Sequence, residues 1–217
     1  MNKFSLSAPQ ATTISLICFG LPILTSLQIV SAGFPVITLT NDGNAAMIFI
    51  ELILAATALL YLRSQDFDIT HLYPRPSWRS TLAGLLLAVV AWLASGMATS
   101  GAASLTHITG LHGMSRFSFG ELSLVSIVCF AMVNGTFEEV FLLGVLARGL
   151  RHHGPSLALG VSLLVRMLYH LYQGPLGVVW VLTFGLTLTL AYLWKRTLWP
   201  PVLAHILWDI VPYFYKG

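Results

Sequence analysis

The sequence predicts an all-α, polytopic membrane protein with about seven transmembrane helices. Hydrophobic residues make up 56% of the 217-residue chain and charged residues only 9%, and the mean hydropathy is +0.81. A soluble domain averages about 25% charged residues, so this chain has too few charges to cover a globular surface. Sequences rich in Gly, Pro and Asn also divide the chain into apolar runs of spanning length.

The first apolar run, Ala11–Val30, has about the 20 residues that one membrane crossing needs. Lys3 before it and the small residues Val30-Ser31-Ala32 at its end are also features of a secretory signal peptide. The apolar part of a signal peptide is usually only about 7–15 residues long. We therefore favour a first transmembrane helix, with cleavage within residues 1–32 as the alternative.

Six further runs, each of roughly 17–25 residues, are bounded by turn sequences and predict six more spans. They are Asn44–Leu62, Ser80–Ala103, Ser123–Ala147, Ser156–Tyr172, Leu176–Trp194 and Leu198–Phe214. The segment Ser104–Gly120 is too polar to span, and we expect a short amphipathic piece at the outer interface. We interpret its histidines, His107 and His112, as solvated loop residues.

The basic residues predict the orientation, because Lys and Arg are in excess in cytoplasmic loops. With a cytoplasmic N-terminus, the outside segments hold only Arg116 and Lys216, and the inside segments hold Lys3, Arg63, Arg75, Arg79, Arg148, Arg151, Lys195 and Arg196. We therefore predict that the C-terminus lies outside. The expected location is the cell membrane of a prokaryote, with the lipid bilayer as a partner. The net charge is +3, but the sequence contains no run of Lys or Arg, so we expect no nucleic acid partner.

Six ionisable residues lie inside the predicted spans of the C-terminal half, where an unpaired charge costs several kcal/mol. They are Glu138, Glu139, Arg166, His170, His205 and Asp209. His205 and Asp209 are four residues apart, as are Arg166 and His170, so each pair shares one helix face. The adjacent glutamates point about 100° apart. We predict one polar cavity near the middle of the membrane. The alternative is a set of polar contacts that only hold helices together.

Three segments resemble the ordered motifs of the CAAX protease and bacteriocin-processing family, whose members are intramembrane endopeptidases related to type II CAAX prenyl endopeptidases. The family pattern is Glu-Glu-x-x-x-Arg, Phe-x-x-x-His and His-x-x-x-Asn or Asp. It aligns with Glu138–Gly144, a segment ending at His170, and His205–Asp209. The resemblance covers about a third of the chain. We expect a single membrane domain over residues 1–217, in which 1–120 form three spans and an outer loop and 121–217 form a four-helix catalytic core that carries these motifs.

Two positions depart from the family pattern. The arginine of the first motif is Leu143 here, and the phenylalanine of the second motif is Arg166. We infer that the cation has moved, so that Arg166 supplies the positive charge that Glu139 would otherwise receive from its own helix. The alternative is an inactive family member.

The resemblance implies peptide hydrolysis by water, with Glu138 as general base and His170 helping to hold the water. His205 would then donate to the oxyanion, with Asp209 orienting it, and Glu139 would set the charge balance. We expect no required cofactor. A zinc site formed by Glu138, His170 and His205 is the alternative, because two histidines and a carboxylate suit that metal.

The implied substrate is a membrane-anchored or lipidated protein or peptide, and the sequence does not distinguish prenylated tails from bacteriocin leaders or sorting segments. Two other classes of function use the same residue types. A proton-coupled transporter would relay protons through such groups, although the chain shows no inverted repeat. A non-enzymatic immunity or scaffold protein would tolerate loss of Glu138.

Overall fold

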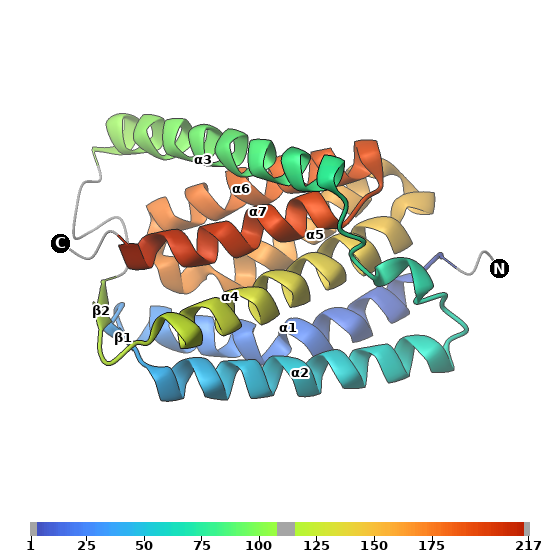
Figure 1. Cartoon of the computed structure of the whole chain (residues 1–217), viewed down its shortest axis with the longest axis horizontal. Helices are drawn as coiled ribbons and strands as arrows, with labels where there is room; N and C mark the ends of the chain where they lie inside the picture. Colours follow the sequence, from blue (N-terminus) through green and yellow to red (C-terminus); the bar gives the residue numbers. More distant parts are fainter. Residues whose placement is uncertain (1–3, 108–115, 215–217) are drawn as a thin grey trace.

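A computed structural model describes residues 4–107 and 116–214, and in these residues seven α-helices lie side by side as a bundle (Figure 1). Neighbouring helices in the chain run in opposite directions, so α1 begins at the end of the bundle opposite to the one where α7 ends (Figure 1). The helices are α1 (Ala8–Ser31), α2 (Asn41–Ser64), α3 (Trp78–Thr106), α4 (Leu124–Glu139), α5 (Pro155–Tyr169), α6 (Gly174–Lys195) and α7 (Trp199–Ile210).

Shorter elements connect these helices. A π-helix, Val140–Ala147, directly continues α4. In the part of the chain that the structure describes, 3-10 turns lie at Thr70–Leu72, Arg151–His153, Leu171–Gln173 and Val211–Phe214. The strands β1 (Ile37–Leu39) and β2 (Phe117–Phe119) form a small parallel sheet at the end of the bundle where α1 ends (Figure 1).

The sheet occupies part of the outer segment for which we expected an amphipathic piece. In the described part of that segment, α3 continues to Thr106, His107 is exposed, and β2 follows. His112 lies outside the described residues. The two strands are joined by a backbone bond from the Ile37 N–H to the Arg116 carbonyl and by the hydroxyls of Thr38 and Ser118, which are 2.8 Å apart.

Among the described residues, five helical segments are long and apolar enough to cross a membrane, and the chain is a multi-pass membrane protein. They are Ala8–Ser31, Asn41–Ser64, Trp78–Thr106, Leu124–Ala147 and Leu171–Lys195. These segments coincide with the first four predicted spans and the sixth. The other two predicted spans are too long: α5 has only 15 residues and α7 only 12. Helix α7 ends at Ile210, and the 3-10 turn Val211–Phe214, which contains Pro212, follows it directly.

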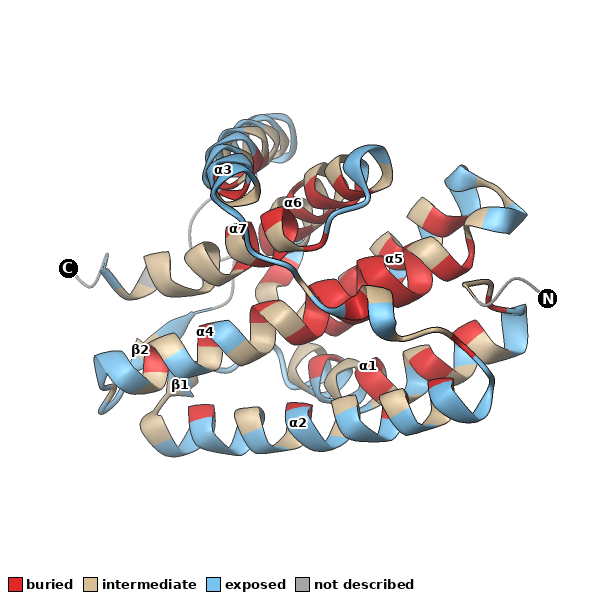
Figure 2. Cartoon of the chain, turned by 45° about the vertical axis from the view of Figure 1, so that its right-hand side comes forward, coloured by how far each residue is buried: buried red, intermediate tan, exposed pale blue. Residues whose placement is uncertain are grey.

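Burial differs sharply between the two halves of the bundle (Figure 2). Buried residues gather on α4, its π-helical extension, α5 and the neighbouring face of α6, whereas α2 and α3 are largely exposed (Figure 2). Large apolar side chains such as Phe49 on α2 and Leu86 on α3, each 66% exposed, point outward. In a bilayer this outward surface contacts lipid, so its exposure carries no hydrophobic cost.

Close packing joins the helices that carry the predicted site. Helix α4 packs on α7 and α2, and α5 packs on α6 and α1. Gly135 of α4 faces α7 so closely that a Cβ there would lie 3.0 Å from the Ile206 backbone nitrogen. Because a small residue lets two backbones approach, α7 can bring His205 against the last turn of α4.

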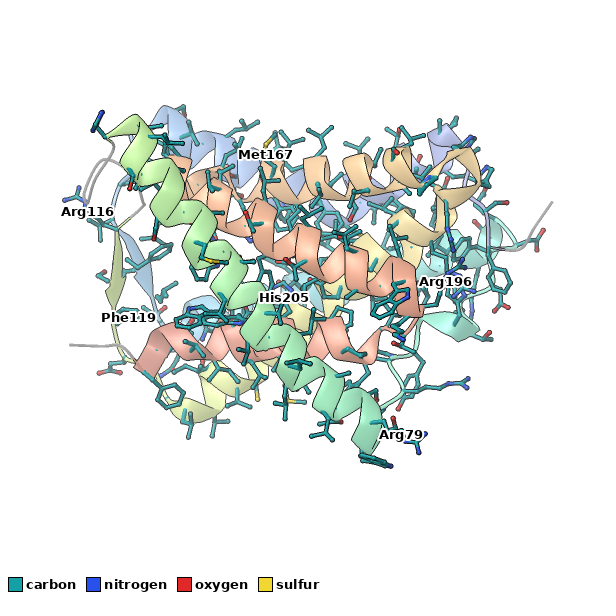
Figure 3. The ribbon with its side chains drawn as sticks, turned by 90° about the horizontal axis from the view of Figure 1, so that it is seen from above. Arg79, Arg116, Phe119, Met167, Arg196 and His205 are labelled. Carbon is teal, nitrogen blue, oxygen red and sulfur yellow. The ribbon has the colours of Figure 1, made fainter. Side chains whose placement is uncertain are left out.

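Basic residues separate between the two ends of the bundle. Arg79 and Arg196 lie at the end where α1 begins, and Arg116 lies at the opposite end (Figure 3). The helix termini that carry Arg63, Arg148 and Lys195 share the end of Arg79 (Figure 1). Lys3 and Lys216 lie outside the described residues. The side of the membrane that each end faces stays a prediction.

Candidate active site

Two adjacent glutamates end α4 and begin the candidate site. Glu138 is 5% exposed and Glu139 is fully buried. The π-helix that starts at Val140 has a wider turn than an α-helix, a feature found frequently at functional sites. Neighbouring residues on a helix point in different directions, and the two carboxylates accordingly have different partners.

Glu139 joins three helices through one oxygen. Its Oε1 accepts a hydrogen bond from Arg166 Nη2 of α5 at 2.6 Å and another from His205 Nδ1 of α7 at 2.6 Å. Arg166 is only 1% exposed, so this ion pair is shielded from water. This charge-assisted pair holds Arg166 and Glu139 firmly in position, because either side chain alone would be a buried, unpaired charge.

Glu138 uses one oxygen, Oε2, for a second set of contacts. The hydroxyl of Tyr169, the last residue of α5, donates to this oxygen. Arg166 Nη1 lies 3.5 Å from it and His205 Nε2 lies 3.8 Å from it. Arg166 therefore contacts both glutamates, and the His205 ring lies between the two carboxylates.

The contacts of His205 define which nitrogen carries a proton. A carboxylate only accepts, so Nδ1 of His205 donates to Glu139 and Nε2 faces Glu138. Asp209, one turn further along α7, places Oδ1 3.5 Å from the same Nε2. The other Asp209 oxygen, Oδ2, accepts from the Asn134 amide of α4 at 2.8 Å. This bond fixes the orientation of the Asp209 carboxylate.

His170 lies beside this cluster, at the C-terminal end of α5. Its Nδ1 lies 3.0 Å from the Arg166 carbonyl oxygen, which only accepts, so Nδ1 donates and Nε2 remains for a ligand. Its ring packs against Tyr169 with 4.3 Å between centroids. Within residues 4–107 and 116–214, no hydrogen bond or ion pair joins His170 to Glu138. The structure thus brings together five of the six predicted residues and places His170 next to them.

Two residues of the cluster were missed in the sequence. Asn134 lies one turn before Glu138 on α4, and Tyr169 directly precedes His170. Asn134 is four residues from Glu138 and Tyr169 is three residues from Arg166, and this helical spacing is the signal that could have found them. Glu51 is also buried, at 5% exposure, and its Oε2 has no hydrogen-bond partner among the described residues.

The comparison with protein families identifies the region that holds the cluster. Residues 120–211 match the model of the family described as "Type II CAAX prenyl endopeptidase Rce1-like". The match confirms the resemblance found in the motifs, and it contains α4 to α7 with every residue of the cluster. No curated protein and no solved structure matches the chain.

The geometry explains the two departures from the CAAX protease pattern. Leu143, where the family has arginine, is fully buried in the apolar π-helix. Arg166, where the family has phenylalanine, makes the 2.6 Å contact to Glu139. Room for this larger side chain comes from Gly185 of α6, where a Cβ would lie only 2.5 Å from Arg166 Cδ. A cation therefore reaches Glu139 from α5.

The same cluster fits a metal ion poorly. Glu138, Glu139 and His205 each offer one donor atom, and these atoms lie within 4.8 Å of one another. This set replaces the His170 of the predicted zinc site with Glu139. However, the Arg166 guanidinium already lies 2.6 Å from the Glu139 oxygen. This buried positive charge offsets part of the carboxylate charge that would hold a divalent cation, and the step proposed below uses no metal.

Proposed function

We propose that this protein is an intramembrane endopeptidase that hydrolyses a peptide bond of a membrane-anchored or lipidated protein. One observation carries the proposal: Glu138 Oε2 and His205 Nε2 face each other at 3.8 Å in a buried cluster built by three helices. A base and a donor at this separation could both contact one water and the carbonyl that it attacks. The family of residues 120–211 supports peptide hydrolysis as the reaction.

Glu138 is the proposed general base. Glu139 is fully buried and its Oε1 already accepts two hydrogen bonds, so it is less able to reach a water. Glu138 retains slight exposure. In the proposed step, Glu138 removes a proton from water, the hydroxide oxygen attacks the scissile carbonyl carbon, and the proton then passes to the leaving amine. Base catalysis of this kind contributes roughly 10²–10⁴-fold.

His205 is the proposed donor to the developing oxyanion. When protonated, its ring donates to Glu139 from Nδ1 and keeps an N–H at Nε2 for the substrate. Removal of one such donor typically costs about 10²–10³ in rate. Asp209, oriented by Asn134, would stabilise the protonated ring from the other side. Glu139 holds the ring in place, and Arg166 compensates the negative charge of the two glutamates.

His170 is proposed to hold the attacking water together with Glu138. Its Nδ1 donates to the Arg166 carbonyl, which fixes the ring and leaves Nε2 to accept a hydrogen bond from water. Because no cofactor enters this scheme, we propose that activity is independent of metal. Helices α4 to α7 then form the catalytic half, and α1 to α3 form the rest of one membrane domain.

The first prediction concerns Glu138. We expect Glu138→Gln to lower cleavage at least ~100-fold, because an amide cannot take up the proton, while the protein still inserts in the membrane. The assay co-expresses membrane-anchored reporters carrying prenylated tails, bacteriocin leaders or C-terminal sorting segments, and detects the cleaved product by mass. Glu121→Gln, at an exposed position before α4, is the matched control and should cleave normally.

Two results would contradict the scheme. Full turnover by both Glu138→Gln and His170→Ala would show that Glu138 is not the general base and that His170 does not hold the water. Loss of activity with a chelator, restored by added zinc, would overturn the metal-independent mechanism.

One observation favours a second function, that of a non-catalytic immunity or scaffold protein. Leu143 replaces the arginine of the first family motif. Such a protein would keep its biological effect in a Glu138→Ala variant, whereas an endopeptidase would lose it. The contact between Arg166 and Glu139 supports the endopeptidase, because it supplies the missing cation.

A further inference from the structure

A second polar site lies at the end of the bundle where α1 begins, apart from the glutamate cluster. It is a pocket of about 280 Å³ formed by the segment before α1, the turn after the π-helix and the end of α6. Its walls are Phe4, Ser5, Arg148, Arg151, His152 and Arg196. We propose that this pocket binds a phosphoryl group, either of an anionic phospholipid or of a water-soluble phosphate compound.

The pocket concentrates positive charge from three arginines. No carboxylate of the described residues lies within 4.0 Å of the guanidinium groups of Arg148, Arg151 and Arg196. Arg151 Nη1 is buried and has no hydrogen-bond partner among these residues. A buried donor without a partner is rare in proteins and costs free energy. This nitrogen belongs to one of the arginines that line the pocket.

The walls of the pocket are fixed by specific contacts. The backbone N–H of Leu6 donates to the Gly149 carbonyl at 2.9 Å, and the Leu6 side chain is buried. A Cβ at Gly149 would lie 2.6 Å from Leu6 Cγ, so only glycine permits this close approach. His152 Nδ1 donates to the same carbonyl at 2.9 Å, which holds its ring and leaves Nε2 free to face a ligand.

One arginine of the pocket is also oriented by an aromatic ring. The Arg148 guanidinium carbon lies 4.5 Å from the centre of the Phe4 ring. A guanidinium that lies over an aromatic ring keeps the N–H groups at its own edge available to an anion. The segment before α1 therefore both closes the pocket and positions one of its cations.

The chemistry of these groups favours a phosphoryl ligand over a simple carboxylate. Three guanidinium groups match three oxygens and a charge of about −1 to −2. The location also fits, because basic pockets between transmembrane helices on the cytoplasmic side bind phospholipid head groups. The predicted orientation places this end in the cytoplasm, and Figure 3 shows Arg196 there together with Arg79.

The positive-inside rule alone does not account for this pocket. That rule requires only that basic residues lie on one side, as Arg63 and Arg79 do. Both of these are exposed, and neither contributes to the pocket. They provide matched controls, since each can lose one positive charge at the same end of the molecule.

The experiment measures binding to the full-length protein purified in detergent. The probes are inorganic phosphate, short-chain phosphatidylglycerol and short-chain phosphatidylcholine, and the readout is the dissociation constant, with thermal stability as a check on folding. We expect Arg151→Gln and Arg196→Gln to weaken binding of the anionic probe roughly tenfold or more. Arg63→Gln and Arg79→Gln should leave it unchanged. Arg196 is exposed, so its variant should fold even if Arg151→Gln does not.

Each outcome decides the proposal. Binding of phosphatidylglycerol but not of phosphate identifies a lipid head group, and binding of both identifies the phosphoryl group itself. Binding of neither anionic probe, or equal loss in all four variants, overturns the proposal. Equal binding of phosphatidylcholine also overturns it, because the arginines would then not select for net negative charge.

Discussion

A single buried oxygen, Glu139 Oε1, holds the candidate site together. It accepts from Arg166 on α5 and from His205 on α7, and both bonds measure 2.6 Å. Removing one member of a buried ion pair typically destabilises a protein by about 3–5 kcal/mol, because the other charge stays buried without a partner. Arg166 therefore has two roles here: it stabilises the bundle and it sets the charge around Glu138.

The next prediction tests whether Arg166 replaces the missing motif arginine. We expect Arg166→Leu to lower the free energy of unfolding by about 3–5 kcal/mol and to reduce cleavage strongly. Adding Leu143→Arg to this variant restores a cation one turn after Glu139 and should recover part of both losses. The measurements are thermal denaturation in detergent and the membrane cleavage assay. If Arg166→Leu leaves folding and activity unchanged, the cation has not moved to this position.

The sequence predicted the charged members of the site better than the neutral ones. Glu138, Arg166 and His205 stand out because a charge in an apolar run is costly unless it is paired or hydrated, and it therefore indicates a functional site. Tyr169 and Asn134 are ordinary at helix interfaces, and their roles depend on helix rotation, which the sequence alone does not define. For the same reason, the sequence did not show that Glu139, rather than Asp209, contacts His205 Nδ1.

At the scale of the elements, one glycine on α6 makes room for the ion pair. A Cβ at Gly185 would lie 2.5 Å from Arg166 Cδ and 2.7 Å from its Nε. Contacts this short require Arg166 to move, and it is enclosed in a fully packed region. The place that Arg166 takes on α5 therefore depends on the absence of a side chain at Gly185 of α6.

This pairing yields a prediction for α6. Gly185→Ala should displace Arg166 from Glu139, destabilise the protein by roughly 1–3 kcal/mol through overpacking and reduce cleavage. Gly160→Ala is the control, since Gly160 is exposed on α5 and a Cβ there would meet nothing within 4 Å. The control should be neutral or stabilising by about 0.5–1 kcal/mol. Thermal denaturation of both variants checks this, and equal behaviour would contradict the proposed space requirement.

Helix lengths and strands show where sequence patterns were insufficient. Hydropathy predicted spans over Ser156–Tyr172 and Leu198–Phe214, but the α-helices there end at Tyr169 and Ile210. Apolar composition continues past both ends, and 3-10 turns replace the α-helix. The strands β1 and β2 have three residues each, and their pairing joins segments that are far apart in the chain. No local pattern specifies such a pairing.

At the scale of the whole molecule, the two ends of the bundle differ in charge, and this difference predicts the topology. The end where α1 begins carries Arg79, Arg148 and Arg196, whereas Arg116 lies at the opposite end, beside the sheet (Figure 3). Moving several arginines across a bilayer is costly, so the arginine-rich end should stay in the cytoplasm. The helix directions of Figure 1 then place the end of α7 outside.

Reporter fusions test this arrangement. Fusions after Asp42 and at Gly217 should report the outside, and fusions after Arg79 and after Gly154 should report the cytoplasm. The short helices α5 and α7 make this test informative, because opposite locations for Gly154 and Gly217 exclude a chain in which only one of the two crosses the membrane. If the fusions after Asp42 and at Gly217 are both cytoplasmic, the orientation is wrong. The phosphoryl pocket would then face the outer leaflet, while the internal geometry of the glutamate cluster would be unaffected.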